Sequence, residues 1–107
     1  MLVAYVSGHG FGHATRTCEV LRAVRRLRPE LAIGVVSAAP EWLFRRALGD
    51  ALVFRALKCD VGLAQRGALE IDEPGTARAW QAFVGTWEAR LAAETAWLRE
   101  VHATLVL

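Results

Sequence analysis

The stretch that decides the fold is residues 2–16, LVAYVSGHGFGHATR, where an apolar run leads directly into a turn with three glycines and two histidines. Leu2 to Ser7 is short, continuous and bounded by glycine, which is typical of a central parallel strand covered on both faces. After the turn, apolar residues recur at helical spacing as far as Pro29, namely Ala14, Cys18, Leu21, Val24 and Leu27. The stretch predicts a strand, a glycine turn and an amphipathic helix in succession.

The same alternation continues along the chain. Ala32 to Val36 repeats the strand pattern, and Glu41 to Leu48 predicts a short helix ended by Gly49. Leu52 to Leu57 predicts a third strand. Residues 59–72, CDVGLAQRGALEID, have no sustained period and predict a long loop, and loops of this length are often functional.

The last third of the chain predicts one long helix and a final strand. Asp72 or Thr76 is suited to cap a helix that runs to about Val101, and ATLVL at the end is β-prone. Core packing is the expected role of the stripe formed by Trp80, Phe83, Trp87, Leu91 and Leu98. The order of elements predicts an α/β fold, a Rossmann-like open parallel sheet with right-handed crossovers.

Composition limits the classes of function. The chain is 54% hydrophobic and 22% charged with a net charge of +2, which fits a folded core and gives nucleic-acid binding no support. No stretch is long enough to form a transmembrane segment. Cys18 and Cys59 form no CxxC pair, and we expect reduced thiols in a cytoplasmic protein.

The chain stops inside an apolar run, which domains rarely do. We therefore expect residues 1–107 to be part of an N-terminal Rossmann-like domain of a longer protein, or else a short chain that adds its last strand to a partner's sheet. An isolated piece would expose a sheet edge and part of the aromatic stripe, so self-association is expected.

The glycine turn fits neither of two familiar phosphate motifs. A P-loop needs lysine and then Ser or Thr after its glycine, but His13 and Ala14 follow Gly12. A dinucleotide fingerprint needs G-x-G-x-x-G, whereas Gly8, Gly10 and Gly12 are spaced two apart. HGFGH lacks the helical scaffold and glutamate of a zinc protease, so neither a metal nor a cofactor is expected.

Acid–base chemistry remains for His9 and His13. A neutral imidazole can take a proton from a hydroxyl, while the glycines let a ligand approach the backbone closely. The alternative is that both histidines only cap the turn. Arg16 is suited to reach an anionic group of a ligand or to pair with Glu19 or Glu30, while Asp60 and Gln65 are suited to bind hydroxyl groups of a ligand or to cap their loop.

GHGFGHATR, VVSAAPEWLF, CDVGLAQRGALEID and the final TLVL resemble the N-terminal glycosyltransferase-like region of L-arabinokinase-type proteins. The chain is more loosely similar to the N-terminal half of GT-B glycosyltransferases, including UDP-glycosyltransferases. That resemblance implies an acceptor-side half whose partner half, outside these residues, holds a nucleotide-sugar donor. It also implies that His13, or second His9, is the base. We expect the ligand-binding residues to be Gly8, Gly10, Phe11, Gly12, Arg16, Asp60 and Gln65.

Two functions follow from this resemblance. The first is the acceptor half of a glycosyltransferase that moves a sugar from a nucleotide-sugar donor to an acceptor hydroxyl, inactive as this chain alone. The second is a non-catalytic module that binds a sugar or nucleotide sugar and regulates an attached sugar kinase.

Overall fold

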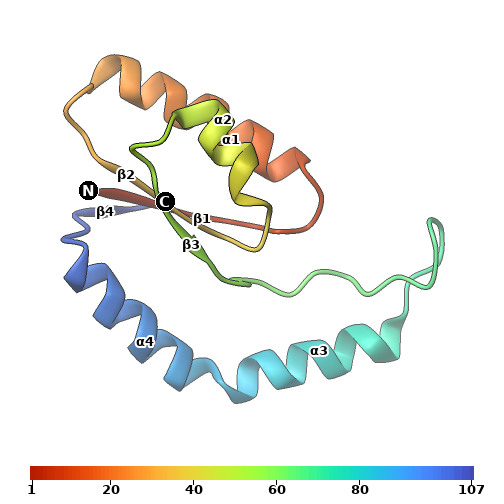
Figure 1. Cartoon of the computed structure of the whole chain (residues 1–107). Helices are drawn as coiled ribbons and strands as arrows, with labels where there is room; N and C mark the ends of the chain where they lie inside the picture. Colours follow the sequence, from red (N-terminus) through yellow and green to blue (C-terminus); the bar gives the residue numbers. More distant parts are fainter.

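The structure is a computed structural model that describes residues 1–107, an α/β fold with a single parallel sheet (Figure 1). The elements are β1 (Leu2–Val6), α1 (Gly12–Leu27), β2 (Ile33–Ser37), α2 (Glu41–Leu48), β3 (Val53–Ala56), α3 (Glu73–Gly85), α4 (Trp87–Glu100) and β4 (Leu105–Val106). This order confirms the fold class and every strand predicted from the sequence.

The sheet has the strand order β3-β2-β1-β4, and all pairs are parallel. β1 pairs with β2 from Leu2 opposite Ile33 to Val6 opposite Ser37, so the carboxyl ends of these central strands lie side by side. Ligands of open α/β sheets bind beyond this edge, which here carries the glycine turn.

One face of the sheet packs on α1 and α2 (Figure 1). Leu2, Ala4 and Val6 alternate along β1 toward this face, because successive strand residues point to opposite sides. They join a core of twelve buried residues, completed by Ala14, Cys18, Leu21, Ile33, Val35, Ala39, Phe44, Leu48 and Leu52. Cys18, one of the apolar residues at helical spacing, is buried in this core, and Gly49 ends α2 as predicted, at a φ of 81°.

The opposite face of the sheet is covered by α4 (Figure 1). Tyr5, Val36 and Arg55 form one row across β1, β2 and β3 on this face. Glu94 of α4 bridges the row, because it accepts a hydrogen bond from the Tyr5 hydroxyl at 2.9 Å and forms an ion pair with Arg55 at 2.8 Å. Val36 lies between these two partners of Glu94 and is fully buried.

The prediction of a single long helix is wrong, because the segment forms two helices, α3 and α4, that are separated at Thr86. Gly85 and Thr86 are weak helix formers, and the Thr86 hydroxyl donates to the Ala82 and Phe83 carbonyls, which favours a break. Asp72 caps α3 as predicted, since its Oδ1 accepts the Gly75 N–H at 3.0 Å.

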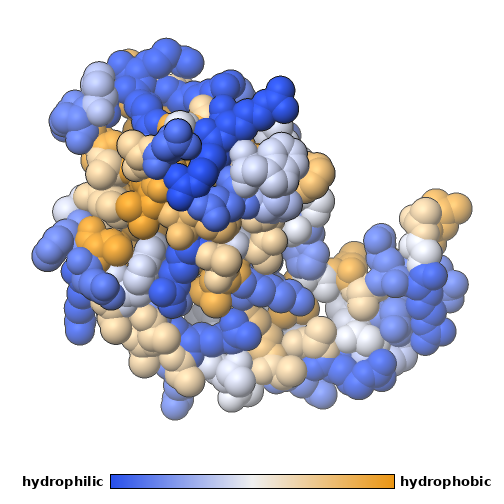
Figure 2. Space-filling model, in the orientation of Figure 1, coloured by the Kyte–Doolittle hydropathy of each residue, from blue (hydrophilic) through white to orange (hydrophobic).

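The predicted core packing of the aromatic stripe is also wrong in its outer part. Trp80, Trp87 and Leu91 are 56%, 53% and 55% exposed. α3, which carries Trp80, extends past the strands, so its apolar side finds no sheet to cover (Figure 1). Figure 2 shows hydrophobic side chains lying open on this arm and at the tip of the loop before it. None of the helices has the length and apolar character needed to cross a bilayer.

Candidate functional site

An open cleft lies at the carboxyl edge of the sheet, between the glycine turn and the segment that follows β3. It consists of two adjoining hollows of about 500 and 550 Å³, and Ser7, His13 and Asp60 line both. His9 and Gln65 line only the second. The structure therefore brings five of the predicted site residues to one place, namely His9, Gly10, His13, Asp60 and Gln65, although they come from segments about fifty positions apart in the chain.

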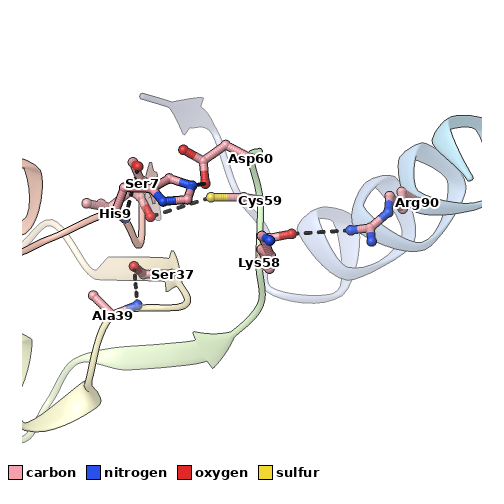
Figure 3. Close-up of polar contacts among 9 residues, drawn as sticks. Ser7, His9, Ser37, Ala39, Lys58, Cys59, Asp60 and Arg90 are labelled. Atoms are coloured by element: carbon pink, nitrogen blue, oxygen red, sulfur yellow. Dashed lines mark hydrogen bonds and ion pairs between the residues drawn. The ribbon is translucent and has the colours of Figure 1, made fainter. Parts of the chain in front are cut away.

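His9 and Asp60 face one another across this cleft (Figure 3). His9 Nε2 lies 3.7 Å from Asp60 Oδ1, which is within the range of an ion pair and longer than a hydrogen bond. Asp60 Oδ1 is itself shielded from solvent and has no hydrogen-bond partner, although the Asp60 side chain as a whole is partly exposed. His9 Nε2 is the polar group that faces this unsatisfied oxygen, so the two side chains form one unit in the wall of the cleft.

Gly62 fixes the place of the His9 ring. A Cβ atom built on Gly62 would overlap the imidazole, so the ring occupies the space that a side chain at position 62 would fill. His9 also has its backbone N–H bonded to Ser7 Oγ at 3.3 Å, an arrangement that Ala39 N–H and Ser37 Oγ repeat at 3.0 Å after β2 (Figure 3). The histidine is thus positioned by the turn behind it and by the loop in front of it.

Each of the three positions in the turn has its own structural reason to be glycine. A Cβ on Gly8 would lie 2.8 Å from Ala38 Cβ, so the turn after β1 can pass the turn after β2 only without a side chain. Gly10 has a φ of 68°, which favours glycine. Gly12 begins α1 and has open space around it. Two of the three glycines therefore shape the chain, and the third leaves the helix start accessible.

His13 lies in the first turn of α1, and its side chain makes no hydrogen bond or ion pair. The N-terminus of α1 has no side-chain cap, so the first N–H groups of α1 and the His13 imidazole are both accessible near the cleft. The alternative role of the histidines as turn caps is not observed, because neither imidazole bonds a backbone group.

Four predicted ligand residues lie outside the cleft lining, namely Gly8, Phe11, Gly12 and Arg16. Phe11 is exposed and packs edge-on against Trp42 with ring centroids 6.3 Å apart. Arg16 is exposed and makes no ion pair, while its two proposed partners Glu19 and Glu30 bind Arg22 and Arg28 instead. Their predicted roles in ligand binding stay predictions.

Sequence reasoning missed Tyr5, Ser7, Thr17 and Cys59, which complete the first hollow. Ser7 stands directly before the first glycine, and Thr17 follows His13 by one helical turn, so both positions carried a signal. Burial raises the pKa of the Cys59 thiol, and its Sγ donates to the Val6 carbonyl at 3.5 Å. Cys59 is therefore a neutral wall residue and not a nucleophile at neutral pH.

Comparison with known proteins relates the chain to a plant protein. It is 32% identical over 105 residues to L-arabinokinase of Arabidopsis thaliana, and the alignment covers 96% of this chain and 10% of that protein. The chain thus spans about a tenth of the length of the relative it matches. No family model matches the chain, and no solved structure matches it. The resemblance to L-arabinokinase-type proteins is confirmed by this similarity, and the resemblance to GT-B glycosyltransferases stays a prediction.

Proposed function

We propose that this chain is the sugar-binding, acceptor-side part of a glycosyltransferase-like region, in which His9 takes a proton from a bound sugar hydroxyl. The observation that carries the proposal is the pair formed by His9 Nε2 and the unsatisfied Asp60 Oδ1, 3.7 Å apart at the edge of an open cleft. A carboxylate beside an imidazole stabilises the imidazolium that forms when the ring accepts a proton.

The contact with Asp60 changes which histidine is favoured. The resemblance alone put His13 first, but His13 has no carboxylate partner, whereas His9 has one. His13 and the free N–H groups of α1 are placed to bind an oxygen of the same ligand from the other side of the cleft. Gln65 offers both a donor and an acceptor to sugar hydroxyls.

The relative's name supports a carbohydrate as ligand, since that protein is an L-arabinokinase. It supports equally a second function, a non-catalytic module that binds a sugar or nucleotide sugar and regulates an attached kinase. The proposed chemistry would need a nucleotide-sugar donor held by residues outside this chain, which spans about a tenth of that relative. The two functions differ in whether the cleft binds a nucleotide sugar by itself: the acceptor half would bind only the free sugar, whereas the regulatory module would bind a sugar or a nucleotide sugar.

Calorimetric titration of the purified chain with L-arabinose and with UDP-L-arabinose tests the proposal. We expect saturable binding of the free sugar that His9→Ala and Asp60→Asn each weaken by about threefold to tenfold, the loss of one or two hydrogen bonds. His102→Asn is the matched control, because His102 lies after α4, outside the cleft, at a φ of 53° that asparagine tolerates.

Each outcome has a distinct meaning. Tighter binding of UDP-L-arabinose than of the free sugar would favour the regulatory module over the acceptor half. Sugar binding that both cleft variants leave unchanged would contradict the assignment of His9 and Asp60. Absence of sugar binding to the folded chain would contradict the proposal as a whole.

A further inference from the structure

A second cavity lies on the α4 side of the sheet and shares Tyr5 and Cys59 with the cleft. Its volume is about 270 Å³. Most of its wall is apolar and is formed by Leu57, Phe83, Trp87, Leu91 and Leu98. At about 30 Å³ for each water of bulk liquid, this volume is sufficient for a single substituted ring.

The only carboxylate of this cavity is already neutralised. Both oxygens of Glu94 are engaged, one by the Tyr5 hydroxyl at 2.9 Å and the other by Arg55 at 2.8 Å. The Arg55 guanidinium therefore offsets the charge of Glu94, and the cavity receives little net negative charge from this carboxylate.

Two cations at the rim have no carboxylate partner. Arg90 donates through Nε to Thr86 Oγ1 at 2.8 Å and through Nη1 to the Lys58 carbonyl at 3.2 Å, and Figure 3 shows the second contact. Its guanidinium lies 4.8 Å from the centre of the Phe83 ring, while Nη2 donates to nothing. The Lys58 ammonium forms no ion pair either. Arg90 and Lys58 thus both line the cavity with its aromatic walls, and neither forms an ion pair.

We infer that this cavity binds a small aromatic acid, a single ring that carries an anionic group. The ring would lie among Phe83, Trp87 and Leu91, whose apolar surface is now partly open to water. The anion would accept from Arg90 Nη2 and lie close to the Lys58 ammonium. This site is separate from the His9–Asp60 pair and does not depend on the function proposed above.

Benzoate is the probe, followed by saturation-transfer NMR on the full chain. We expect saturable binding with a Kd on the order of 1 mM, which is reasonable for a ligand of this size. Benzyl alcohol, which has the same ring without the charge, should bind about threefold more weakly, and benzylammonium more weakly still. Equal binding of benzoate and benzylammonium, or no saturable binding of benzoate up to about 10 mM, would overturn the inference.

Two tryptophans supply a matched pair of variants. Trp87 lines the cavity and Trp80 does not, yet the two are similarly exposed and both contact Phe83. Trp87→Ala should weaken benzoate binding by about threefold to tenfold, and Trp80→Ala should leave it unchanged. Equal losses in the two variants would overturn the placement of the ligand.

Two further variants test two separate points. One tests whether the cavity prefers an anion, and the other tests whether benzoate binds in the neighbouring sugar cleft. Lys58→Met should remove much of the preference for benzoate over benzyl alcohol, and an unchanged preference would contradict the role of Lys58. His9→Ala should bind benzoate as the unaltered chain does. A loss there would show that benzoate occupies the sugar cleft and would overturn the inference of a separate site.

Discussion

The two halves of the chain are stabilised in different ways. Every buried residue lies at or before Leu52, and no residue from Val53 to Leu107 is buried. The first half has a core around Phe44 between the sheet and α1 and α2. The second half contains α3 and α4, which have no buried residue of their own.

Polar contacts and β4 attach the second half to the first, together with Phe54, which packs against Phe44 in the core. Glu94 joins α4 to Tyr5 and Arg55, and Arg90 joins it to the Lys58 carbonyl. β4 pairs with β1 through Leu2 and Val3. Apolar burial is the dominant stabilising contribution in folded proteins, so this half should open at a lower free energy than the first. The candidate site lies where the two halves meet, with His9 from one and Asp60 from the other.

The largest effect is expected from Phe44→Ala in the core of the first half. Phe44 is fully buried, so the cavity should lower the free energy of unfolding by about 3–5 kcal/mol. Trp87→Ala removes an even larger side chain from the second half, but this side chain is half exposed. The substitution should lower the free energy of unfolding by about 1 kcal/mol or less. Urea denaturation measures both. Equal losses would contradict the division into two halves.

The next effect concerns the attachment of α4. Glu94→Gln removes the charge that Arg55 and Tyr5 share, and it should lower the protection of α4 by about 1–3 kcal/mol in native-state hydrogen exchange. α1 should keep its protection. Glu100→Gln is the control, since Glu100 is exposed on the same helix and forms no ion pair. An equal loss of protection in α1 and α4 would show that the halves open together.

A third prediction concerns pH and Tyr5. Burial, together with the hydrogen bond to Glu94, raises the pKa of Tyr5 well above its usual value near 10. Above pH 10 the unfolded chain loses this proton and the folded chain keeps it, so stability should fall by about 1 kcal/mol between pH 10 and 11. Tyr5→Phe should fall less steeply over that interval, as measured by urea denaturation at each pH.

Tyr5 is the only tyrosine in the chain, so absorbance at 295 nm follows its ionisation directly. The folded protein should show no transition near pH 10, and Glu94→Gln should move the transition toward lower pH. A transition at the ordinary value in the unaltered protein would contradict the contact between β1 and α4.

The sequence predicted the first half well because its patterns are local. Strand runs, helical spacing and the glycine at position 49 each determine their own element, and Gly12 begins α1 directly after the turn. The second half was predicted less well. The stripe at Trp80, Trp87 and Leu91 has the spacing of a core helix, but whether a sheet lies opposite depends on tertiary structure.

The position of the site was predictable from the order of the strands, but the pairing of its side chains was not. Strand order brings the segment after β3 to the glycine turn, so the proximity of Asp60 to the histidines followed from the topology. The choice of His9 over His13 as the partner of Asp60 did not, because it depends on the ring resting over Gly62.

The smallest effect on stability is expected at Gly62. Gly62→Ala displaces the His9 ring, a movable side chain, so the free energy of unfolding should change by only a few tenths of a kcal/mol. Sugar binding, in contrast, should weaken about threefold or more. Gly67→Ala, in the same loop with open space around it, should change neither. If calorimetric titration finds equal sugar binding in both variants, the position of the His9 ring does not matter to the ligand.

The most direct test of the site is NMR of the three histidine imidazoles during titration with L-arabinose. The proposed function predicts that the His9 and His13 resonances shift together and saturate at one common Kd, while His102 does not move. Asp60→Asn should weaken that Kd by about threefold to tenfold. Saturating sugar that leaves His9 and His13 unmoved would contradict a carbohydrate site at the junction of the two halves.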